Sequence, residues 1–321
     1  MRLTNNMIMK RYLRNLNTSY KTLAKLSDIS SSQKLYSRAS ENPAAAMKAF
    51  NVRNDLARIE FFKNNIVDVK NIYTDYEASI STVNDIVKEI NSMLEQAKNV
   101  TYTDTERAAI ATVLENLQTQ LLDVVNRKSA DRFLFGGANL TELPFEVKDG
   151  KLYYHGVDVD TGTFEKESIY IDFGMGMSSR SGVPVSDNTA FNIAYSGVEL
   201  LGHGVDEDGI SNNIYNIITD LVQMLKNNDT TNLEKYQKKF ESKMSDVLIQ
   251  YADIGQKTNF IEFIENRLNV DEENFLNKQD SLEVADLAEA FMNLEYQRLA
   301  YNAALKIGAN LMEGSLLDFL S

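Results

Sequence analysis

The stretch from residue 66 to residue 97, IVDVKNIYTDYEASISTVNDIVKEINSMLEQA, decides the fold class. Its apolar positions are spaced alternately by three and four residues: Ile66, Val69, Tyr73, Tyr76, Ile80, Val83, Val87, Ile90, Leu94 and Ala97. This period of about 3.5 residues is typical of the a and d positions of a coiled coil. We call such a line of positions a seam. It predicts one long helix that begins near Pro43, because proline fits the first turn of a helix.

Further seams follow this helix. Thr103 and Glu106 have the spacing of a capping box and predict the start of a second helix. Its seam comprises Ile110, Leu114, Leu117, Leu121 and Val124. Two more seams lie beyond residue 210. The shorter one comprises Ile214, Ile217, Leu221 and Met224. The longer one comprises Phe240, Met244, Val247, Tyr251, Ile254, Thr258, Ile261, Leu268 and Phe275. Seamed helices joined by short links fold back on one another, so both ends of the chain are predicted to build one antiparallel helical rod.

The window from Gly136 to Gly209 interrupts the helical pattern. It holds twelve of the 15 glycines, two of the three prolines and both histidines. KLYYHGVDV (151–159) and SIYIDF (168–173) are rich in β-formers. The predicted fold is therefore mainly α, with an inserted β-rich domain and a long antiparallel coiled-coil or helical-bundle rod. The expected domains are terminal helices (1–40 with 283–321), the rod (41–135 with 210–282) and the insert (136–209).

Apolar stripes also mark the two ends of the chain. The N-terminal stripe comprises Leu13, Leu16, Tyr20 and Leu23. The C-terminal candidates are Val284, Leu287, Phe291, Leu294, Leu305, Met312, Leu316 and Leu317. Neither terminal helix is expected to be stable alone, because most helix stability comes from packing. We therefore expect the stripes to pair with each other or with neighbouring subunits, as an assembly interface.

Composition excludes several function classes. The 321 residues carry a formal net charge of −13, which argues against nucleic acid and anionic membranes as partners. The absence of cysteine excludes disulfides, thiolate metal sites and cysteine nucleophiles. His155 and His203 are 48 residues apart and do not predict a metal pair. Gly136-Gly137 lacks a P-loop lysine, so a turn is favoured over an anion site. No catalytic, cofactor or metal residue is predicted.

Five segments together carry a family resemblance. They are MRLTNNMIMKRYLRNLN (1–17), ASENPAAAMKAFNVRNDL (39–56), RFLFGGANLTELPF (132–145), GQKTNFIEFIENRL (255–268) and DLAEAFMNLEYQRLAYNAALKIGANLMEGSLLDFL (286–320). These segments resemble the bacterial flagellin family, and within it the hook-associated protein 3 family of hook–filament junction proteins. The resemblance covers the chain outside the predicted insert.

This resemblance implies a structural protein rather than an enzyme, without cofactors. It implies a ring of identical subunits between the inner hook-associated junction protein and flagellin, on the extracellular flagellum. Export by the flagellar type III pathway is implied, with a chaperone on the C-terminal helix; the first twenty residues show no cleaved signal peptide. Two alternatives remain, flagellin itself and a glycan-binding or enzymatic module within the insert.

The chain departs from the family pattern at three places. Gln33 stands where the family usually has glycine, which predicts a more helical bend there. Glu41 and Asn42 replace a pair of aspartates before Pro43, at an implied subunit contact with one charge fewer. Lys257 replaces an arginine, which is expected to weaken a bidentate contact.

Overall fold

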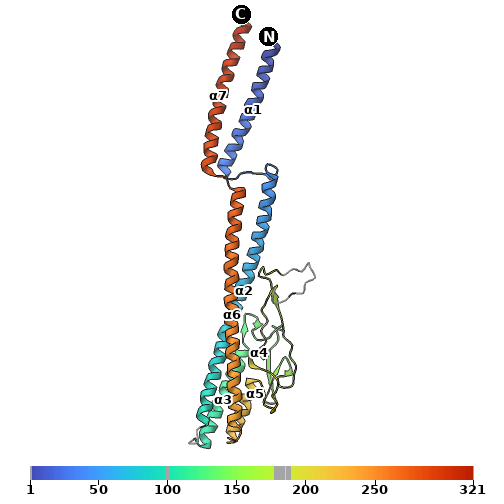
Figure 1. Cartoon of the computed structure of the whole chain (residues 1–321), viewed down its shortest axis with the longest axis vertical. Helices are drawn as coiled ribbons and strands as arrows, with labels where there is room; N and C mark the ends of the chain where they lie inside the picture. The colour runs from blue at the N-terminus through green and yellow to red at the C-terminus, as the bar shows by residue number, and fades with distance from the viewer. Residues whose placement is uncertain (1, 99–101, 177–184, 186–188, 321) are drawn as a thin grey trace. The chain divides into compact units, whose positions relative to one another are not determined.

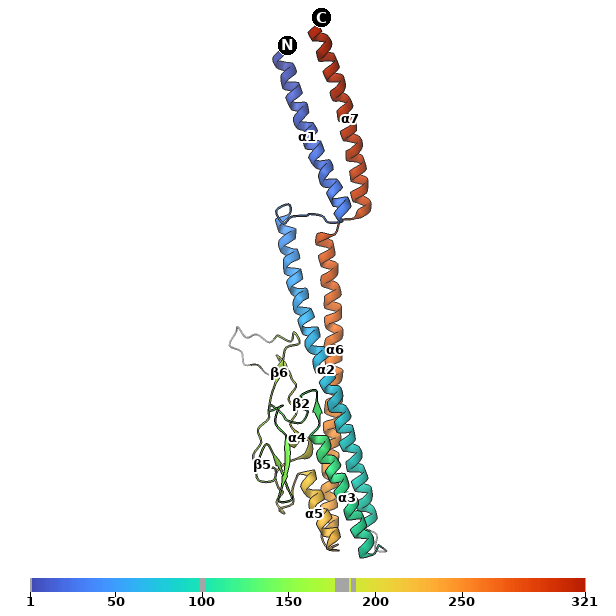
Figure 2. The same ribbon diagram turned by 180° about the vertical axis from the view of Figure 1, so that it is seen from behind.

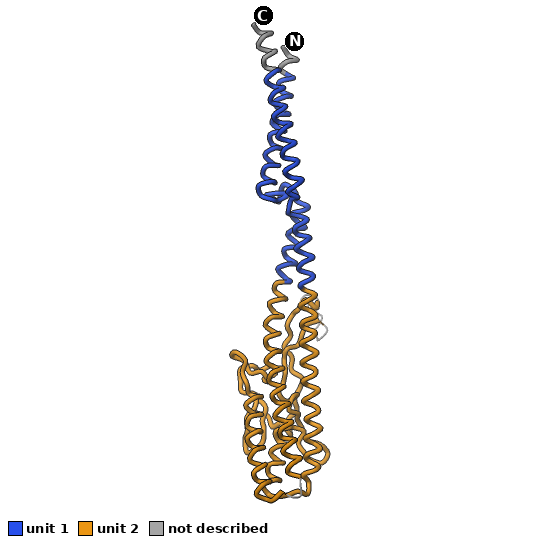
Figure 3. The backbone as a smooth tube through the Cα atoms, turned by 90° about the vertical axis from the view of Figure 1, so that its left-hand side faces the viewer, with its two compact units in different colours: residues 1–59, 269–321 blue, residues 60–268 orange. Residues whose placement is uncertain are grey.

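The fold comes from a computed structural model, which describes residues 2–98, 102–176, 185 and 189–320, with the backbone alone for 2–6 and 311–320. The chain divides into two compact units (Figure 3). Unit 1 comprises residues 1–59 and 269–321, and unit 2 comprises residues 60–268. Unit 1 combines segments from the two ends of the chain, and unit 2 is one continuous segment. The predicted division into three domains stays a prediction.

The opening stretch forms the core of unit 2. It lies within α2 (Pro43–Ala97), which starts at Pro43 as predicted. Every one of its ten seam residues is at most 2% exposed. Burying an aliphatic side chain of this size contributes about 1.5–3 kcal/mol, so this seam is a principal source of stability in the unit.

A second long helix, α6 (Leu233–Glu283), lies alongside α2 and runs in the opposite direction (Figures 1 and 2). In unit 2, the Lys70 ammonium lies 3.0 Å from the Glu265 carboxylate, and the Gln237 amide donates to Glu95. Phe240, Val247, Ile254 and Ile261 are buried, as their seam predicts. The prediction of long antiparallel helices is confirmed.

Two shorter helices complete the helical part of unit 2. In α3 (Asp104–Val125), the Thr103 hydroxyl accepts from the Glu106 N–H, and the Glu106 carboxylate accepts from the Thr103 N–H at 2.7 Å. The predicted capping box is confirmed. Val125 rather than Val124 is fully buried, a shift of one position at the last turn. The Gln118 amide donates to the Tyr215 carbonyl of α5 (Ile214–Lys226) at 2.9 Å and so joins the two helices.

The insert consists of short strands and loops. β3 (Phe145–Lys148), β4 (Lys151–Tyr154) and β5 (Val157–Asp158) form an antiparallel sheet in that order. Within the insert, β6 (Tyr170–Ile171) also pairs with β7 (Phe191–Asn192). Just before the insert, β1 (Lys128–Ser129) pairs with β2 (Arg132–Phe133). The insert also contains one short helix, α4 (Gly197–Leu201). SIYIDF contributes only two strand residues, because the chain around it pairs through isolated backbone hydrogen bonds such as Ile193 N–H to Ile169 O.

Aromatic side chains attach the insert to α2. The Tyr73 and Tyr76 hydroxyls donate to the Asn192 and Ile193 carbonyls, each at 3.4 Å. Tyr195 packs against Tyr76 with ring centroids 5.4 Å apart, and its hydroxyl donates to Gln250 of α6 at 3.0 Å. Burial raises the pKa of Tyr73, Tyr76 and Tyr195 well above the ordinary value for tyrosine. The two seam tyrosines therefore pack, as predicted, and their polar ends also position the insert.

The Gly136-Gly137 pair forms a turn, as predicted. Gly137 has a φ of 62°, and a Cβ at Gly136 would lie 2.3 Å from the Asn139 carbonyl oxygen. The Gly137 N–H donates to the Tyr195 carbonyl, and the Gly197 N–H donates to the Phe135 carbonyl. These bonds join the start of the insert to the segment that begins α4.

Unit 1 contains the two terminal helices, α1 (Arg2–Ser32) and α7 (Leu287–Leu320), which pack side by side (Figures 1 and 2). It also contains the start of α2 and the end of α6, where Arg53 forms an ion pair with Glu283. Within the described residues, no helix is both long and apolar enough to cross a membrane.

Candidate assembly surface

α1 and α7 meet along a narrow line of small and half-buried side chains. The Tyr12 hydroxyl donates to the Ala304 carbonyl at 3.0 Å. The Gln297 amide donates to the Ser19 hydroxyl at 2.9 Å. A Cβ at Gly308 would lie 2.0 Å from the Tyr12 hydroxyl, so glycine is needed for this approach. The pairing of the terminal helices is therefore partly polar.

Only some of the predicted stripe residues take part in this contact. Leu16, Leu23 and Leu294 are half-buried at or beside the line between the helices. The others are exposed: Leu13, Tyr20, Val284, Leu287, Phe291 and Leu305. Of these, Tyr20 still contacts α7, because its ring centroid lies 6.0 Å from that of Tyr301. Tyr20 is 57% exposed and Phe291 54%. Each of these side chains leaves more than a third of its surface exposed, which suits an interface with another molecule.

Met312, Leu316 and Leu317 belong to the α7 backbone, but their side chains lie outside the described residues. Four exposed apolar residues of α7 were not predicted: Met292, Tyr296, Leu299 and Ile307. The scarcity of charged residues in the α7 sequence could have indicated them, because it implies apolar residues on more than one side of the helix. The apolar surface of α7 is thus broader than the sequence pattern indicated.

The segments that connect the terminal helices to α2 and α6 bond to each other. The Leu35 N–H donates to the Glu283 carbonyl at 2.9 Å, and the Ala285 N–H donates to the Gln33 carbonyl at 3.0 Å. Gln33 has a φ of 58°, in the left-handed region that favours glycine. The expectation of a more helical bend is wrong, because α1 ends at Ser32 and Gln33 adopts the turn that a glycine would make.

Glu41 and Asn42 have local roles at the start of α2. The Asn42 side-chain oxygen accepts from the Ala45 N–H at 3.2 Å, and so caps the helix. The Glu41 carboxylate accepts from the Ser37 N–H at 3.3 Å. Both side chains are exposed, and their implied subunit contact stays a prediction. Lys257 forms an ion pair with Asp253 one turn away on α6, at 2.7 Å.

Two open grooves flank the connecting segment from Lys34 to Glu41. The larger has a volume of about 590 Å³ and is lined by Tyr36, Met47 and Phe50 together with the Arg53–Glu283 pair. The smaller has a volume of about 460 Å³ and lies between this segment and α1 near Tyr20. The Arg53 guanidinium lowers the pKa of the Glu283 carboxyl. These grooves extend the uncovered surface of unit 1 beyond the terminal helices.

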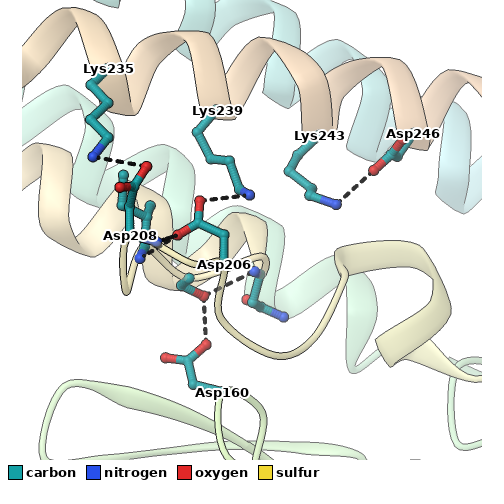
Figure 4. A network of polar contacts seen from close by, with 10 residues as sticks. Asp160, Asp206, Asp208, Lys235, Lys239, Lys243 and Asp246 are labelled. Atoms are coloured by element: carbon teal, nitrogen blue, oxygen red, sulfur yellow. Dashed lines mark hydrogen bonds and ion pairs between the residues drawn. The ribbon is translucent and has the colours of Figure 1, made fainter.

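Three aspartates of the insert, Asp160, Asp206 and Asp208, bond to other side chains of this protein (Figure 4). Asp160 accepts from the Ser211 hydroxyl at 2.5 Å and from the Asn216 amide at 2.8 Å. Asp206 accepts from the Lys239 ammonium at 3.0 Å, which lowers its pKa. Asp208 pairs with Lys235 of α6 at 3.1 Å. This network fastens the loop before α5 to α6, so its carboxylates have a structural explanation.

The two histidines lie at the ends of one row of aromatic rings. His155 packs on Tyr154, Tyr154 on Phe164, and Phe164 on His203, with centroid separations of 4.3, 5.8 and 5.4 Å. The His155 ring also contacts the Gly136 carbonyl at 3.1 Å. Among the described residues, no three acidic or histidine side chains are grouped as metal ligands.

Sequence comparison identifies the first part of the chain. Residues 3–139 match the bacterial flagellin N-terminal helical region. The predicted flagellin resemblance is therefore confirmed over this region, which includes α1, α2, α3 and the Gly136-Gly137 turn. No curated protein matches the sequence as a relative.

Solved structures share the fold at low sequence identity. A Vibrio parahaemolyticus structure assigned as a flagellar hook-associated protein has a TM-score of 0.63 and 16% identity, over 76% of this chain and all of that one. FlgL from Bacillus cereus has a TM-score of 0.54 and 20% identity, over 72% and 99%. Flagellar hook-associated protein 3 from Legionella pneumophila has a TM-score of 0.58 and 11% identity, over 72% of this chain and 98% of that one. The chain therefore has the fold of these flagellar proteins.

Proposed function

We propose that this chain, which carries the flagellin N-terminal helical region, is a non-catalytic structural subunit of the bacterial flagellum. In this proposal it polymerises at the hook–filament junction, between the inner hook-associated junction protein and flagellin. The shared fold with a protein named flagellar hook-associated protein 3 supports this position.

The observation that carries the proposal is the outward-facing apolar surface of unit 1. Phe291, Leu299 and Leu305 on α7, and Leu13 and Tyr20 on α1, are each more than 40% exposed. An apolar surface of this kind on a soluble protein is explained by a partner molecule. Burial against neighbouring subunits would offset the cost of ordering the terminal helices.

The same surface supports an account of export. Terminal helices with a thin, partly polar contact are easily separated, so the chain can pass unfolded through a secretion channel and order itself on assembly. The apolar side of α7 is then the expected site of an export chaperone before assembly. Once assembled, the protein is expected on the extracellular flagellum.

Deletion of the gene in its host tests the proposal. Cells are expected to keep intact hooks and to release unpolymerised flagellin into the medium, as seen by electron microscopy and by immunoblotting of the supernatant. Restoring the wild-type gene should restore filaments. Normal filaments on the deletion strain would overturn the proposal.

Flagellin itself is the second candidate, because the match over residues 3–139 is to flagellins as a class. The same experiment separates the two candidates. If the chain were the filament subunit, its deletion would remove the major secreted flagellin instead of releasing it.

A further inference from the structure

The two segments of unit 1 have opposite charge. Residues 1–59 contain eleven Lys or Arg and three Asp or Glu, a formal net charge of +8. Residues 269–321 contain three Lys or Arg and ten Asp or Glu, a formal net charge of −7. The whole chain has a net charge of −13, so the basic N-terminal segment is an exception within an acidic protein.

The cations of α1 form a row on its outer face. Lys10, Arg14, Lys21 and Lys25 are spaced by four, seven and four residues, which places them on one side of a helix. All four are exposed, and they lie opposite the line of Tyr12, Leu16, Ser19 and Leu23 that faces α7. Within the described part of the chain, none of the four has a carboxylate at ion-pair distance. We call these four residues the cationic row.

The acidic segment also presents carboxylates to solvent. Glu273 and Asp280 near the end of α6, and Glu289 on α7, are exposed, and no ion pair is found for them among the described side chains. Glu295 is exposed too, and pairs only locally with Arg298, at 3.5 Å. We call Glu273, Asp280, Glu289 and Glu295 the acidic set. Exposed apolar side chains, including Phe291 and Tyr296, lie beside it on α7.

We infer that unit 1 of one copy binds unit 1 of a second copy head to tail, with the cationic row of one facing the acidic set of the other. The inference rests on the proposed function, because it names the surfaces that meet in the assembly. Two cationic rows would repel each other, and so would two acidic sets, so the charges disfavour contacts that pair like with like. In the proposed head-to-tail arrangement, the contact repeats from copy to copy and produces a ring or a helix.

Charge and apolar area have different tasks in this contact. Single exposed ion pairs add little affinity, since water and salt screen them. Opposed rows of charge instead select the partner surface and its register, and they accelerate association. Affinity comes from the apolar residues that border both charged sets, such as Leu13 and Tyr20 on α1 and Phe291 on α7.

Charge reversal in the full chain tests the inference. Variant A carries Lys10→Glu, Arg14→Glu, Lys21→Glu and Lys25→Glu. Variant B carries Glu273→Lys, Asp280→Lys, Glu289→Lys and Glu295→Lys, and variant AB carries all eight changes. Self-association is measured by sedimentation velocity over a protein concentration series. A control variant reverses four exposed cations of unit 2: Lys88→Glu, Lys148→Glu, Lys226→Glu and Lys238→Glu.

Variants A and B alone are each expected to associate at least about tenfold more weakly than wild type, because like charges then face each other. An equimolar mixture of A and B is expected to associate again, since each contact then joins opposite charges. Variant AB should also recover, and the control should behave as wild type. Wild-type association should weaken in about 1 M salt, where the Debye length is about 3 Å.

The mixture separates contacts between copies from effects within one chain. If the reversals only disturbed the packing of α1 on α7, mixing A with B would restore nothing, and the inference would be wrong. A wild-type chain that stays monomeric at every concentration and salt would also overturn it. A third result would also overturn it: wild type, but not variant A, binds anionic lipid vesicles, and the mixture of A and B does not associate. That result would assign the cationic row to a lipid surface. The deletion phenotype decides the proposed function separately.

Discussion

The two units use the same heptad spacing with opposite results. In unit 2, the α2 seam is buried against the other helices and the insert, and none of its ten residues is more than 2% exposed. In unit 1, stripes of similar spacing leave Phe291 and Tyr20 more than half exposed. A seam therefore predicts that a helix has an apolar partner, but it does not say whether the partner belongs to the same molecule.

The chemistry of the two contacts differs as well. The unit 2 core is filled with aliphatic and aromatic side chains. In the α1–α7 contact, Tyr12 and Gln297 donate hydrogen bonds across the helices, Gly308 permits close approach, and the Tyr20 ring packs on Tyr301. The contact between the terminal helices therefore contains more polar groups than the core of unit 2.

The largest expected effect is on the buried seam. Ile80→Asp should destabilise unit 2 by about 4 kcal/mol or more, because it places a carboxylate at a fully buried position. Thermal unfolding followed by circular dichroism measures this loss. Ile249→Asp is the matched control, since Ile249 lies on α6 and is 65% exposed. An equal loss of stability in both variants would show that the α2 seam is no more important to folding than an exposed apolar position.

Alkaline pH should weaken unit 2 through its buried tyrosines. Burial raises the folded-state pKa of Tyr73, Tyr76 and Tyr195, so their contribution is complete below the unfolded value of about 10. As the pH rises above that value, the unfolded state loses protons first, and stability falls by about 1.4 kcal/mol per tyrosine for each pH unit. Phenolate absorbance should rise together with unfolding. Tyr195→Phe should move this transition to higher pH.

Disturbing the α1–α7 contact should have a smaller effect. Gly308→Val places a side chain where the Tyr12 hydroxyl lies and should cost about 2 kcal/mol of helix pairing. Faster hydrogen exchange in residues 7–26, with unchanged protection of α2, is the expected result. Ala309→Val, at an exposed position, is the control. Protection of α1 as strong in Gly308→Val as in the control would show that the close approach is dispensable.

The smallest effect on stability is expected at the outer face of α7. Leu305→Asp should change the free energy of unfolding by less than about 0.5 kcal/mol, because Leu305 is 43% exposed. It should nevertheless block incorporation at the hook tip and give the phenotype of the gene deletion. Electron microscopy of complemented cells measures the loss. Full incorporation of a folded Leu305→Asp chain would assign this face another role.

The sequence predicted best where the pattern was regular and the partner was internal. The α2 seam, the Thr103–Glu106 cap and the Gly136-Gly137 turn each depend on neighbours within a few residues or on an unbroken heptad, and all three are confirmed. It predicted less well at the ends. The apolar residues of α7 lie on several sides of the helix, so no single stripe identifies the side that faces α1.

Backbone conformation was also hard to predict at the connecting segment. Gln33 is not a glycine, so the sequence did not predict the left-handed backbone conformation that it adopts. The hydrogen bonds between Gln33 and Ala285 and between Leu35 and Glu283 hold this turn, and they join residues some 250 positions apart. A conformation held by distant partners is not visible in local sequence.

By itself, the sequence determined that the protein is built from long antiparallel helices interrupted by a small insert, because heptad spacing and glycine usage are local properties that restrict the backbone directly. Only the tertiary structure decided which apolar residues are covered. Which residues are covered depends on which helix faces meet, and these can be far apart in the sequence. As a result, the α2 seam is buried, whereas apolar residues on the outer faces of α1 and α7 remain exposed.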